Sequence, residues 1–173
     1  MRYPITSMSF AILAMGAGLS ESAQAVIQNR TMRSHGGTAC QLSIPTTDTK
    51  VRPKAIGFRN EGTTNAFVIC GFPMPDGALT YFVMNVMSLD GAAHGVQCTG
   101  VNGPAYSSPI YSAKNVDTPA DASNTSSISW SAADFGGTSG NDMQSGYFSV
   151  TCVLPAQTSI PNVYVYYNED VGV

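Results

Sequence analysis

The chain has 173 residues, of which 11% are charged and 43% are hydrophobic, and its formal net charge is −3. This length corresponds to one domain, and a chain this apolar can bury a core, which excludes wholesale disorder. The scarcity of lysine, arginine and glutamate disfavours coiled coils, helical repeats and nucleic-acid-binding modules.

The first segment, residues 1–25, has the pattern of a secretory signal peptide. Arg2 supplies a positive start, residues 8–19 are apolar, and Ala23-Gln24-Ala25 is a small-x-small cleavage site. A membrane anchor is the alternative, but the apolar run is shorter than the roughly 20 residues that span a bilayer. We expect a mature, secreted protein that begins near Val26, has no membrane span, and is periplasmic or extracellular.

The mature chain is predicted to begin with a polar N-terminal arm, residues 26–38, followed by a single domain, residues 39–173. Within that domain hydrophobic residues alternate with period two rather than 3.6, which indicates strands. The strand candidates lie around residues 40–44, 56–59, 66–72, 81–87, 96–99, 127–131, 148–154 and 163–167. About eight short antiparallel strands and no confident helix predict an all-β protein, an antiparallel β-sandwich.

Asp-Gly and Asn-Gly pairs mark the predicted turns, since these residues readily take the positive φ that tight turns need. Asp76-Gly77 and Asp90-Gly91 separate three strands, so residues 66–99 are predicted to form a three-stranded antiparallel meander. Residues 112–125 and 136–142 are rich in polar and small side chains and are predicted to be surface loops.

The four cysteines all lie in the mature chain. An even count in an exported domain indicates disulfides, whereas the absence of any CxxC motif disfavours zinc. Three pairings are possible. Cys40, Cys98 and Cys152 each share a strand face with apolar residues, so they should point into the core. We predict that Cys98 pairs with Cys152 and Cys40 with Cys70.

Short motifs around these cysteines occur in a fixed order along residues 38–165. They are Ala39-Cys40, Gly57-Phe-Arg-Asn60, Val68-Ile-Cys70-Gly-Phe-Pro-Met-Pro75, Ser88-Leu-Asp-Gly91, Val96-Gln-Cys98-Thr and Gly146-Tyr-Phe-Ser-Val-Thr-Cys152-Val-Leu-Pro155. In these motifs the chain resembles a loosely defined group of small exported bacterial four-cysteine β-sandwich proteins, mostly without known activity. It departs from the group where Gly71 follows Cys70, a position at which the group tends to have proline. The resemblance implies fold and bacterial export and supplies no catalytic residue.

Catalytic patterns are absent from the sequence. The chain has two histidines, His35 in the predicted arm and His94, which lies near Asp90 across a predicted turn. There is no G-x-S-x-G nucleophile elbow, and the glutamates of the mature chain, Glu61 and Glu169, sit beside turn-like residues rather than in a paired-carboxylate motif. We predict no enzyme activity, no catalytic residue, no cofactor and no resident metal, although aspartates near residues 117–121 and 141–142 leave a surface ion site open.

The aromatic residues of the last strand are more suggestive. Tyr164 and Tyr166 share one face of this strand, and Val163, Val165 and Tyr167 share the other. If the valines face the core, the two tyrosines form an exposed stripe suited to a sugar ring or a protein partner. The alternative is a strand that is partly buried on both faces. The single tryptophan is predicted to belong to the core.

The leading functional prediction is a secreted, non-enzymatic structural or binding protein that assembles with copies of itself. The arm from Val26 to Thr38, or a strand, would add to the sheet edge of a neighbour. The alternative is a carbohydrate-binding or adhesive module that uses Tyr164 and Tyr166. A secreted hydrolase is less favoured and would need His94 beside a carboxylate and a serine in a cleft. The expected partners are the protein itself, another extracellular protein or a glycan, and not nucleic acid.

Overall fold

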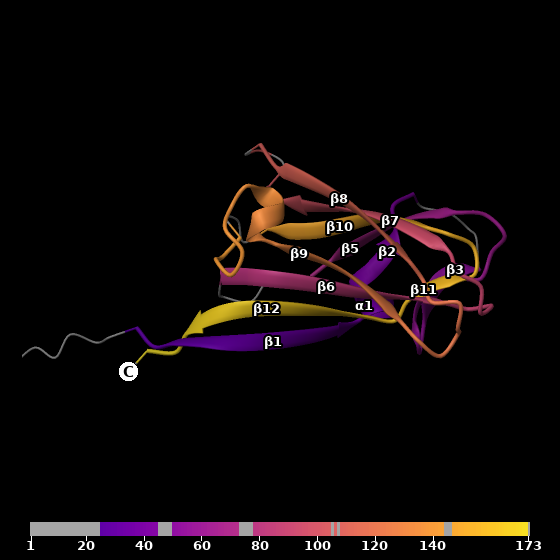
Figure 1. Cartoon of the computed structure of the whole chain (residues 1–173), viewed down its shortest axis with the longest axis horizontal. Coiled ribbons are helices and arrows are strands. Elements are labelled where there is room, and N and C mark those ends of the chain that lie inside the picture. The colour runs from indigo at the N-terminus through magenta and orange to yellow at the C-terminus, as the bar shows by residue number, and fades with distance from the viewer. Residues whose placement is uncertain are drawn as a thin grey trace, which may run out of the picture.

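The computed structural model describes residues 25–44, 50–72, 78–104, 106, 108–143 and 147–172. The predicted signal peptide, apart from Ala25, and the predicted Asp76-Gly77 turn lie outside these residues. The elements are β1 (Ile27–His35), α1 (Gly36–Ala39), β2 (Cys40–Leu42), β3 (Val51–Lys54), β4 (Gly57–Asn60), β5 (Ala66–Gly71), β6 (Ala78–Ser88), β7 (Gly95–Asn102), β8 (Ile110–Asp117), β9 (Ser126–Ser131), the 3-10 helix η1 (Ala132–Phe135), β10 (Phe148–Leu154), β11 (Thr158–Ile160) and β12 (Asn162–Asp170) (Figure 1). None of the helices in this described part is long and apolar enough to cross a membrane.

The strands form two antiparallel sheets that pack face to face (Figure 1). The first sheet has seven strands: β6 pairs with β9 on one side and with β12 and β11 on the other, β1 lies beyond β12, and β4 and β3 lie beyond β11. The second sheet has five strands in the order β2-β5-β10-β7-β8. The predicted all-β, antiparallel β-sandwich with two disulfides is therefore confirmed, but the described residues form twelve strands rather than eight.

Four strands escape the sequence pattern. Two of them, β3 and β11, have only four and three residues, too few for an alternation to stand out. The other two, β1 and β8, lie at the edges of their sheets and carry many polar side chains. An edge strand buries little, so its hydrophobic periodicity is weak.

The segment expected to be a polar arm forms strand β1 and helix α1. β1 pairs with β12 of the same chain along its whole length, from Ile27 opposite Asp170 to His35 opposite Asn162. An ion pair of 2.8 Å between Arg30 and Glu169 joins the two strands. Residues 27–35 therefore form an edge strand of their own sheet, paired with β12 on one side, and the sandwich begins at β1 rather than at residue 39.

The predicted meander over residues 66–99 is wrong. The strands β5 and β7 both pair with β10 in the second sheet, whereas β6 belongs to the first sheet, so consecutive strands cross between layers. Gly91 does take a positive φ of 79°, as a turn requires, but this turn joins the two sheets. Period-two alternation shows which face of a strand is buried and does not identify its neighbours.

The predicted loop over residues 112–125 is also partly wrong, because most of strand β8 lies within it. The outward residues of β8, such as Ala113 and Asn115, are exposed, and Lys114 points inward. Its ammonium group lies 2.7 Å from the Asp134 carboxylate and donates a 2.7 Å hydrogen bond to the Ser129 carbonyl. Lys114 thereby links edge strand β8 of one sheet to β9 and η1 on the other. The second predicted loop, residues 136–142, contains no strand or helix.

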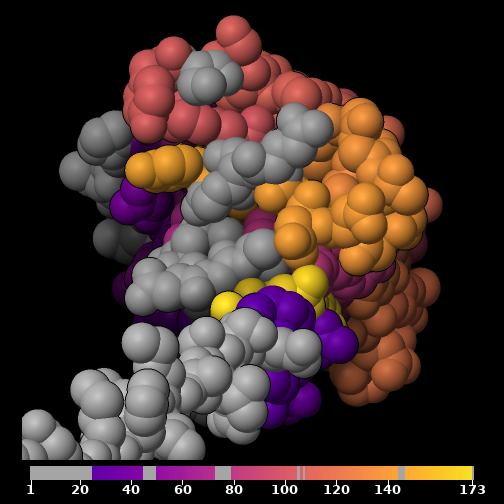
Figure 2. Space-filling view, turned by 90° about the vertical axis from the view of Figure 1, so that its left-hand side faces the viewer, coloured from indigo at the N-terminus to yellow at the C-terminus, as the bar shows by residue number. Residues whose placement is uncertain are grey.

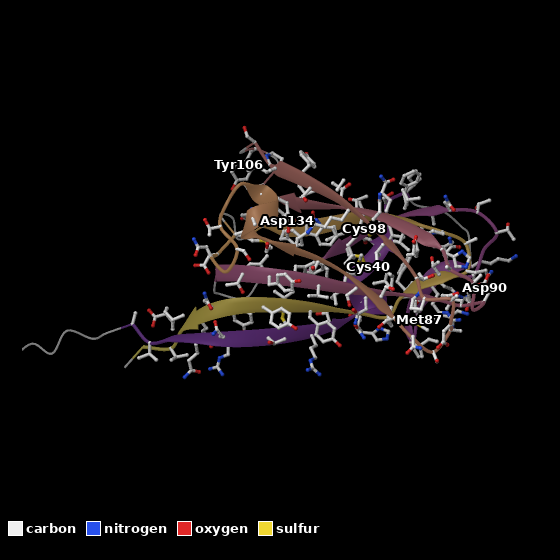
Figure 3. The ribbon with its side chains drawn as sticks, viewed as in Figure 1. Cys40, Met87, Asp90, Cys98, Tyr106 and Asp134 are labelled. Carbon is white, nitrogen blue, oxygen red and sulfur yellow. A yellow bond between two sulfur atoms is a disulfide. The ribbon has the colours of Figure 1, made fainter. Side chains whose placement is uncertain are left out.

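Aromatic rings and cystines fill the space between the sheets. Phe82, Trp130 and Phe148 are buried, with ring centroids 5.0 to 6.1 Å apart, so the tryptophan is a core residue as predicted. Both predicted disulfides form, and all four cysteines are buried (Figure 3). Each joins register partners on neighbouring strands, Cys40 opposite Cys70 and Cys98 opposite Cys152, with Cα atoms 4.0 and 4.1 Å apart. The bridges therefore fasten strands within the second sheet and do not cross the core.

Gly100 of β7 supplies the space into which the Trp130 ring packs. A Cβ atom at this position would lie 2.7 to 2.9 Å from three atoms of the indole ring. We expect Gly100→Ala to lower the free energy of unfolding by about 1–3 kcal/mol, the usual cost of overpacking a core. Chemical denaturation with the disulfides intact measures this. Gly71→Ala in β5 is the matched control, because its Cβ would meet nothing within 4 Å. Equal stability of the two variants would contradict the packing described.

The contact between Lys114 and Asp134 predicts a pH dependence of stability. Burial raises the pKa of the Asp134 carboxyl, but hydrogen bonds from Lys114 and Ser131 outweigh it, and the pKa lies below its ordinary value. The ionised Asp134 therefore stabilises the fold fully at pH values above the pKa of an aspartate in the unfolded chain, about 3.9. This stabilisation is lost as the pH falls through the lower pKa that Asp134 has in the folded protein.

Asp134→Asn should accordingly be less stable than the native protein at about pH 7, with a difference that shrinks as the pH falls below about 4. Urea denaturation across this range measures the effect. The control is Asp117→Asn, an exposed position on the same strand as Lys114, for which we expect little change at any pH. A destabilisation by Asp134→Asn that persists undiminished at low pH would contradict the assignment.

Candidate functional site

The outer face of four neighbouring strands, β9, β6, β12 and β1, carries an unusual set of side chains. The register of the strands arranges their outward residues in three rows. The rows are Thr31, Tyr166, Tyr81 and Ser131; Arg33, Tyr164, Val83 and Ser129; and His35, Asn162, Asn85 and Ser127. We call this surface the tyrosine face.

The two tyrosines singled out in the sequence lie on this face. Val163 and Val165 are buried, with exposed fractions of 0% and 1%, so the alternate residues Tyr164 and Tyr166 point outward as expected. Tyr166 is 38% exposed and Tyr164 is half-buried. The stripe is therefore open at Tyr166 and partly covered at Tyr164.

A third tyrosine, Tyr81 of β6, belongs to the same surface. It stands opposite Tyr166 in the register, is 39% exposed, and its ring centroid lies 5.9 Å from that of Tyr166. The nearly continuous apolar run over residues 81–87 predicts a strand that is buried on both faces or central in a sheet. The strand is central, between β9 and β12, but its Tyr81 face is not buried. Asn85, at the same phase as Tyr81, was the signal that this face is open.

Hydrogen bonds between side chains fix the polar groups of the face. The Tyr81 hydroxyl donates to Ser129 Oγ at 2.7 Å. Asn85 Nδ2 donates to Asn162 Oδ1 at 2.7 Å, and Ser127 Oγ donates to Asn85 Oδ1 at 2.6 Å. These neutral hydroxyls and amides are thus oriented before any ligand arrives, which lowers the entropy cost of binding.

The first row of the tyrosine face opens into a polar pocket of about 300 Å³. Its lining comes from the strand ends of the face and from the loop after η1: Asn29, Thr80, Tyr81, Ser131, Ser139, Gly140 and Asn168. Figure 2 shows this end of the molecule, where β1 and β12 lie side by side and the residues that follow η1 rise next to them. Asn168 Nδ2 donates to Asp142 Oδ1 at 3.0 Å and so ties the loop to β12.

The backbone is irregular where the face meets this pocket. The register between β12 and β6 shifts between Tyr166 and Tyr167, and Thr80 is the additional residue on β6. The Thr80 hydroxyl donates to the Tyr166 carbonyl at 3.1 Å. A bulge of this kind twists the strand and redirects side chains near binding sites; here it places Thr80 among the pocket residues.

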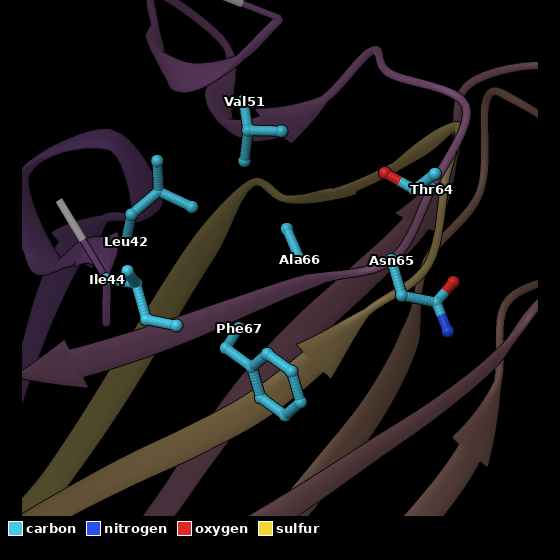
Figure 4. Close-up of a pocket in the computed structure, with 7 residues that line it drawn as sticks. All are labelled: Leu42, Ile44, Val51, Thr64, Asn65, Ala66 and Phe67. Atoms are coloured by element: carbon cyan, nitrogen blue, oxygen red, sulfur yellow. The ribbon is translucent and has the colours of Figure 1, made fainter. Parts of the chain in front are cut away.

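A second pocket, of about 240 Å³, is almost wholly apolar (Figure 4). It is lined by Leu42, Ile44, Val51, Ala66 and Phe67, with Thr64 and Asn65 as its polar members. Ligand sites usually combine apolar walls with several convergent polar groups that orient the ligand. The tyrosine face meets that description better than this pocket does.

The site that a hydrolase would need is not assembled around His94. Asp90 lies between the two possible partners: its Oδ1 accepts from Ser88 Oγ at 2.9 Å and lies 2.8 Å from His94 Nε2. Ser88 is fully buried and also accepts from the Gly91 amide. Hydrogen bonds from His94, the Ala92 amide and Ser88 hold the pKa of Asp90 well below its usual range. A catalytic triad needs the serine bonded to the histidine, and Ser88 is bonded to Asp90 instead. The three side chains therefore stabilise the turn between β6 and β7. This turn lies at the opposite end of the molecule from Asp134 (Figure 3).

The other histidine, the two glutamates and Asp121, which were also considered as site residues from the sequence, form contacts that stabilise local structure. His35 caps α1, where Nδ1 accepts from the Gly37 amide at 3.1 Å and Nε2 lies 3.0 Å from the Ala55 carbonyl oxygen. Glu61 pairs with Lys54 and Arg59, and Glu169 pairs with Arg30. Hydrogen bonds within its turn lower the pKa of Asp121. Among the described residues, no three metal-ligating side chains gather into a group.

Comparison with known proteins yields distant structural likenesses. No protein-family model matches the chain, and no curated sequence matches it. Among solved structures, a xylan-binding module, CBM15, is 13% identical with a TM-score of 0.47, covering 81% of this chain and 97% of that one. TmCBM61 in complex with β-1,4-galactotriose is 8% identical with a TM-score of 0.35, covering 81% and 88%. A structure titled "CBM4 structure and function" is 6% identical with a TM-score of 0.32, covering 80% and 86%. These likenesses are too distant to indicate a ligand, which has to be inferred from the side chains themselves.

Proposed function

We propose that this protein is an exported, non-enzymatic glycan-binding module and that the tyrosine face is its binding surface. The observation that supports this most directly is the pair of exposed rings, Tyr81 and Tyr166, 5.9 Å apart on a sheet face that otherwise carries ordered hydroxyl and amide groups. In the sequence, glycan binding was the alternative to self-assembly, and the third tyrosine and the polar pocket now favour it.

The chemistry of the face matches that of a sugar. A pyranose has apolar C–H faces and a rim of hydroxyl groups, so it needs a flat apolar platform with donors and acceptors around it. Tyrosine provides such a platform together with a polar tip, and asparagine and serine provide hydrogen bonds to hydroxyls. Neutral polar groups are suited to this task, because desolvating them costs less than desolvating charges.

The dimensions of the face suit a short oligosaccharide. Alternate residues on a strand lie about 7 Å apart and neighbouring strands about 4.8 Å apart, so three rows on four strands cover roughly 14 Å by 14 Å. The pocket beyond the first row extends this surface. Two to three linked sugar units, a rough estimate on the same spacing, would fit, with one unit stacked on Tyr166 and in contact with Tyr81, whose ring plane is inclined by 57° to it.

Export is the second part of the proposal. Two disulfides form readily in an oxidising compartment and rarely in the cytosol, and both are present here. Together with the predicted signal peptide and the resemblance to exported bacterial proteins, they support a role in the periplasm or outside the cell.

Removal of the tyrosine rings tests the glycan-binding role. We expect the double substitution Tyr164→Ala and Tyr166→Ala to abolish the signal of the mature protein on a glycan array, a loss of at least about tenfold in affinity, or about 1.4 kcal/mol. Tyr111→Ala is the control, since Tyr111 is 65% exposed but lies on β8 of the second sheet. Circular dichroism verifies the fold. Unchanged binding by the double variant would refute the tyrosine face as the site, and an array without signal for the native protein would refute glycan binding.

Self-association is a second candidate, supported by the outer face of the second sheet. The outward residues of its three central strands are all uncharged: Phe67, Ile69 and Gly71 on β5, Ser149, Thr151 and Val153 on β10, and Gly95, Gln97, Thr99 and Val101 on β7. Phe67 is 54% exposed. A two-fold interface sets a patch against its own copy, so a face without charge avoids self-repulsion. This surface is an alternative to strand addition by the N-terminal segment, which pairs with β12 within its own sheet.

Sedimentation velocity tests this candidate. We expect a concentration-dependent dimer for the native protein and a monomer for Phe67→Glu, because the substitution places a charge opposite itself in a two-fold pair. The control is Tyr166→Ala on the other sheet, which should leave the dimer intact. A native protein that stays monomeric at high concentration would exclude self-association and leave glycan binding unaffected.

A further inference from the structure

Arg33 is the one permanently charged side chain in the three rows of the tyrosine face. It is exposed, and its guanidinium carbon lies 5.3 Å from the centroid of the Tyr164 ring. Among the described residues, no carboxylate forms an ion pair with it. Other cations of the chain differ in this respect: Arg30 pairs with Glu169, and Lys114 pairs with Asp134.

The position of Arg33 relates it directly to the proposed sugar platform. It lies in the same row as Tyr164, one row, or about 7 Å, from the row of Tyr166 and Tyr81. A sugar unit stacked on Tyr166 would therefore bring a substituent of that unit, or the next unit of the chain, up to the guanidinium group. Since Arg30 is on the opposite face of β1, it cannot take this role.

Contact with the Tyr164 ring also prepares the guanidinium group for a specific partner. A guanidinium group stacked on an aromatic ring is held by cation–π attraction, which restricts the long side chain and leaves its N–H edge free. That edge matches the two oxygens of a carboxylate in a bidentate pair. A neutral glycan would leave this charge without a partner.

We propose that Arg33 makes the tyrosine face selective for glycans that carry a carboxylate, that is, for uronic-acid-containing oligosaccharides. This inference rests on the proposed glycan-binding function and adds the class of ligand. The oxyanion of a sulfated sugar presents related chemistry, and the planar carboxylate is the better match to the guanidinium fork.

Calorimetric titration with three matched probes tests the proposal: a uronic-acid oligosaccharide, the same oligosaccharide after carboxyl reduction, and a sulfated neutral oligosaccharide. We expect the native protein to bind the acidic probe at least about tenfold more tightly than the reduced one, the scale of a charge-assisted bidentate pair. Arg33→Gln should abolish the preference, so that this variant binds the acidic and the reduced probe with equal affinity. Arg33→Lys should restore part of the difference, since lysine keeps the charge without the fork.

Arg30→Gln is the control, because it removes a neighbouring positive charge from the other face of the same strand and should leave the selectivity intact. The proposal is overturned if the native protein does not distinguish the acidic from the reduced probe, if Arg33→Gln weakens both equally, or if the sulfated probe binds more tightly than the carboxylate. Binding of the reduced probe that depends on Tyr164 and Tyr166 would in that case still support the tyrosine face. Failure of all three probes to bind would count against both proposals.

Discussion

The register of strand β12 is the constraint on which the candidate site depends. Val163 and Val165 are buried between the sheets, and the alternation of a strand then requires Tyr164 and Tyr166 to face outward. A slip of one residue would reverse this and bury the tyrosines. Pairing on both edges, with β1 on one side and β6 on the other, prevents such a slip. The bulge after Tyr166 interrupts the regular pairing of β12 with β6 at the point where the pocket begins, and the pairing resumes with a shifted register.

The second sheet provides the rigid support for this strand. Its two disulfides join β2 to β5 and β7 to β10, so each cystine fastens a neighbouring strand pair. The chain-entropy model attributes several kcal/mol to such cross-links, about 3 to 5 for each loop of this order. The two sheets in turn meet at Trp130, which packs over Gly100 and donates from its indole nitrogen to the Ser112 carbonyl at 3.0 Å. Residues of the second sheet thereby hold β9, the outermost strand of the tyrosine face.

Sequence patterns predicted those features that follow from the alternation of a single strand. The inward direction of the cysteines, the burial of Trp130 and the outward direction of Tyr164 and Tyr166 all belong to this class. The pairing of the cysteines depends on neighbouring strands; it was chosen from three possibilities and is confirmed. Features that depend on the neighbour of a strand were not predictable in this way. Tyr81 joins Tyr166 only because β6 pairs with β12, about 85 residues later in the chain, a distance that no local pattern reports. The meander failed for the same reason, since consecutive strands lie in different sheets.

Strand β1 illustrates how a polar segment that the sequence predicts to be an arm becomes part of the candidate site. Its inward residue Met32 is half-buried opposite Val165, which anchors the strand to the core side of β12. Its outward residues then extend the tyrosine face by a fourth strand: Arg33 beside Tyr164, Thr31 beside Tyr166 and Asn29 in the pocket. The polarity that concealed β1 in the sequence is what an edge strand with a hydrated outer face requires, because its outward side chains contact water rather than a core. Exchange of this strand with a neighbour, the route to assembly expected from the sequence, would remove Arg33, Thr31 and Asn29 from their own face. Assembly by that route would therefore compete with the proposed use of this face.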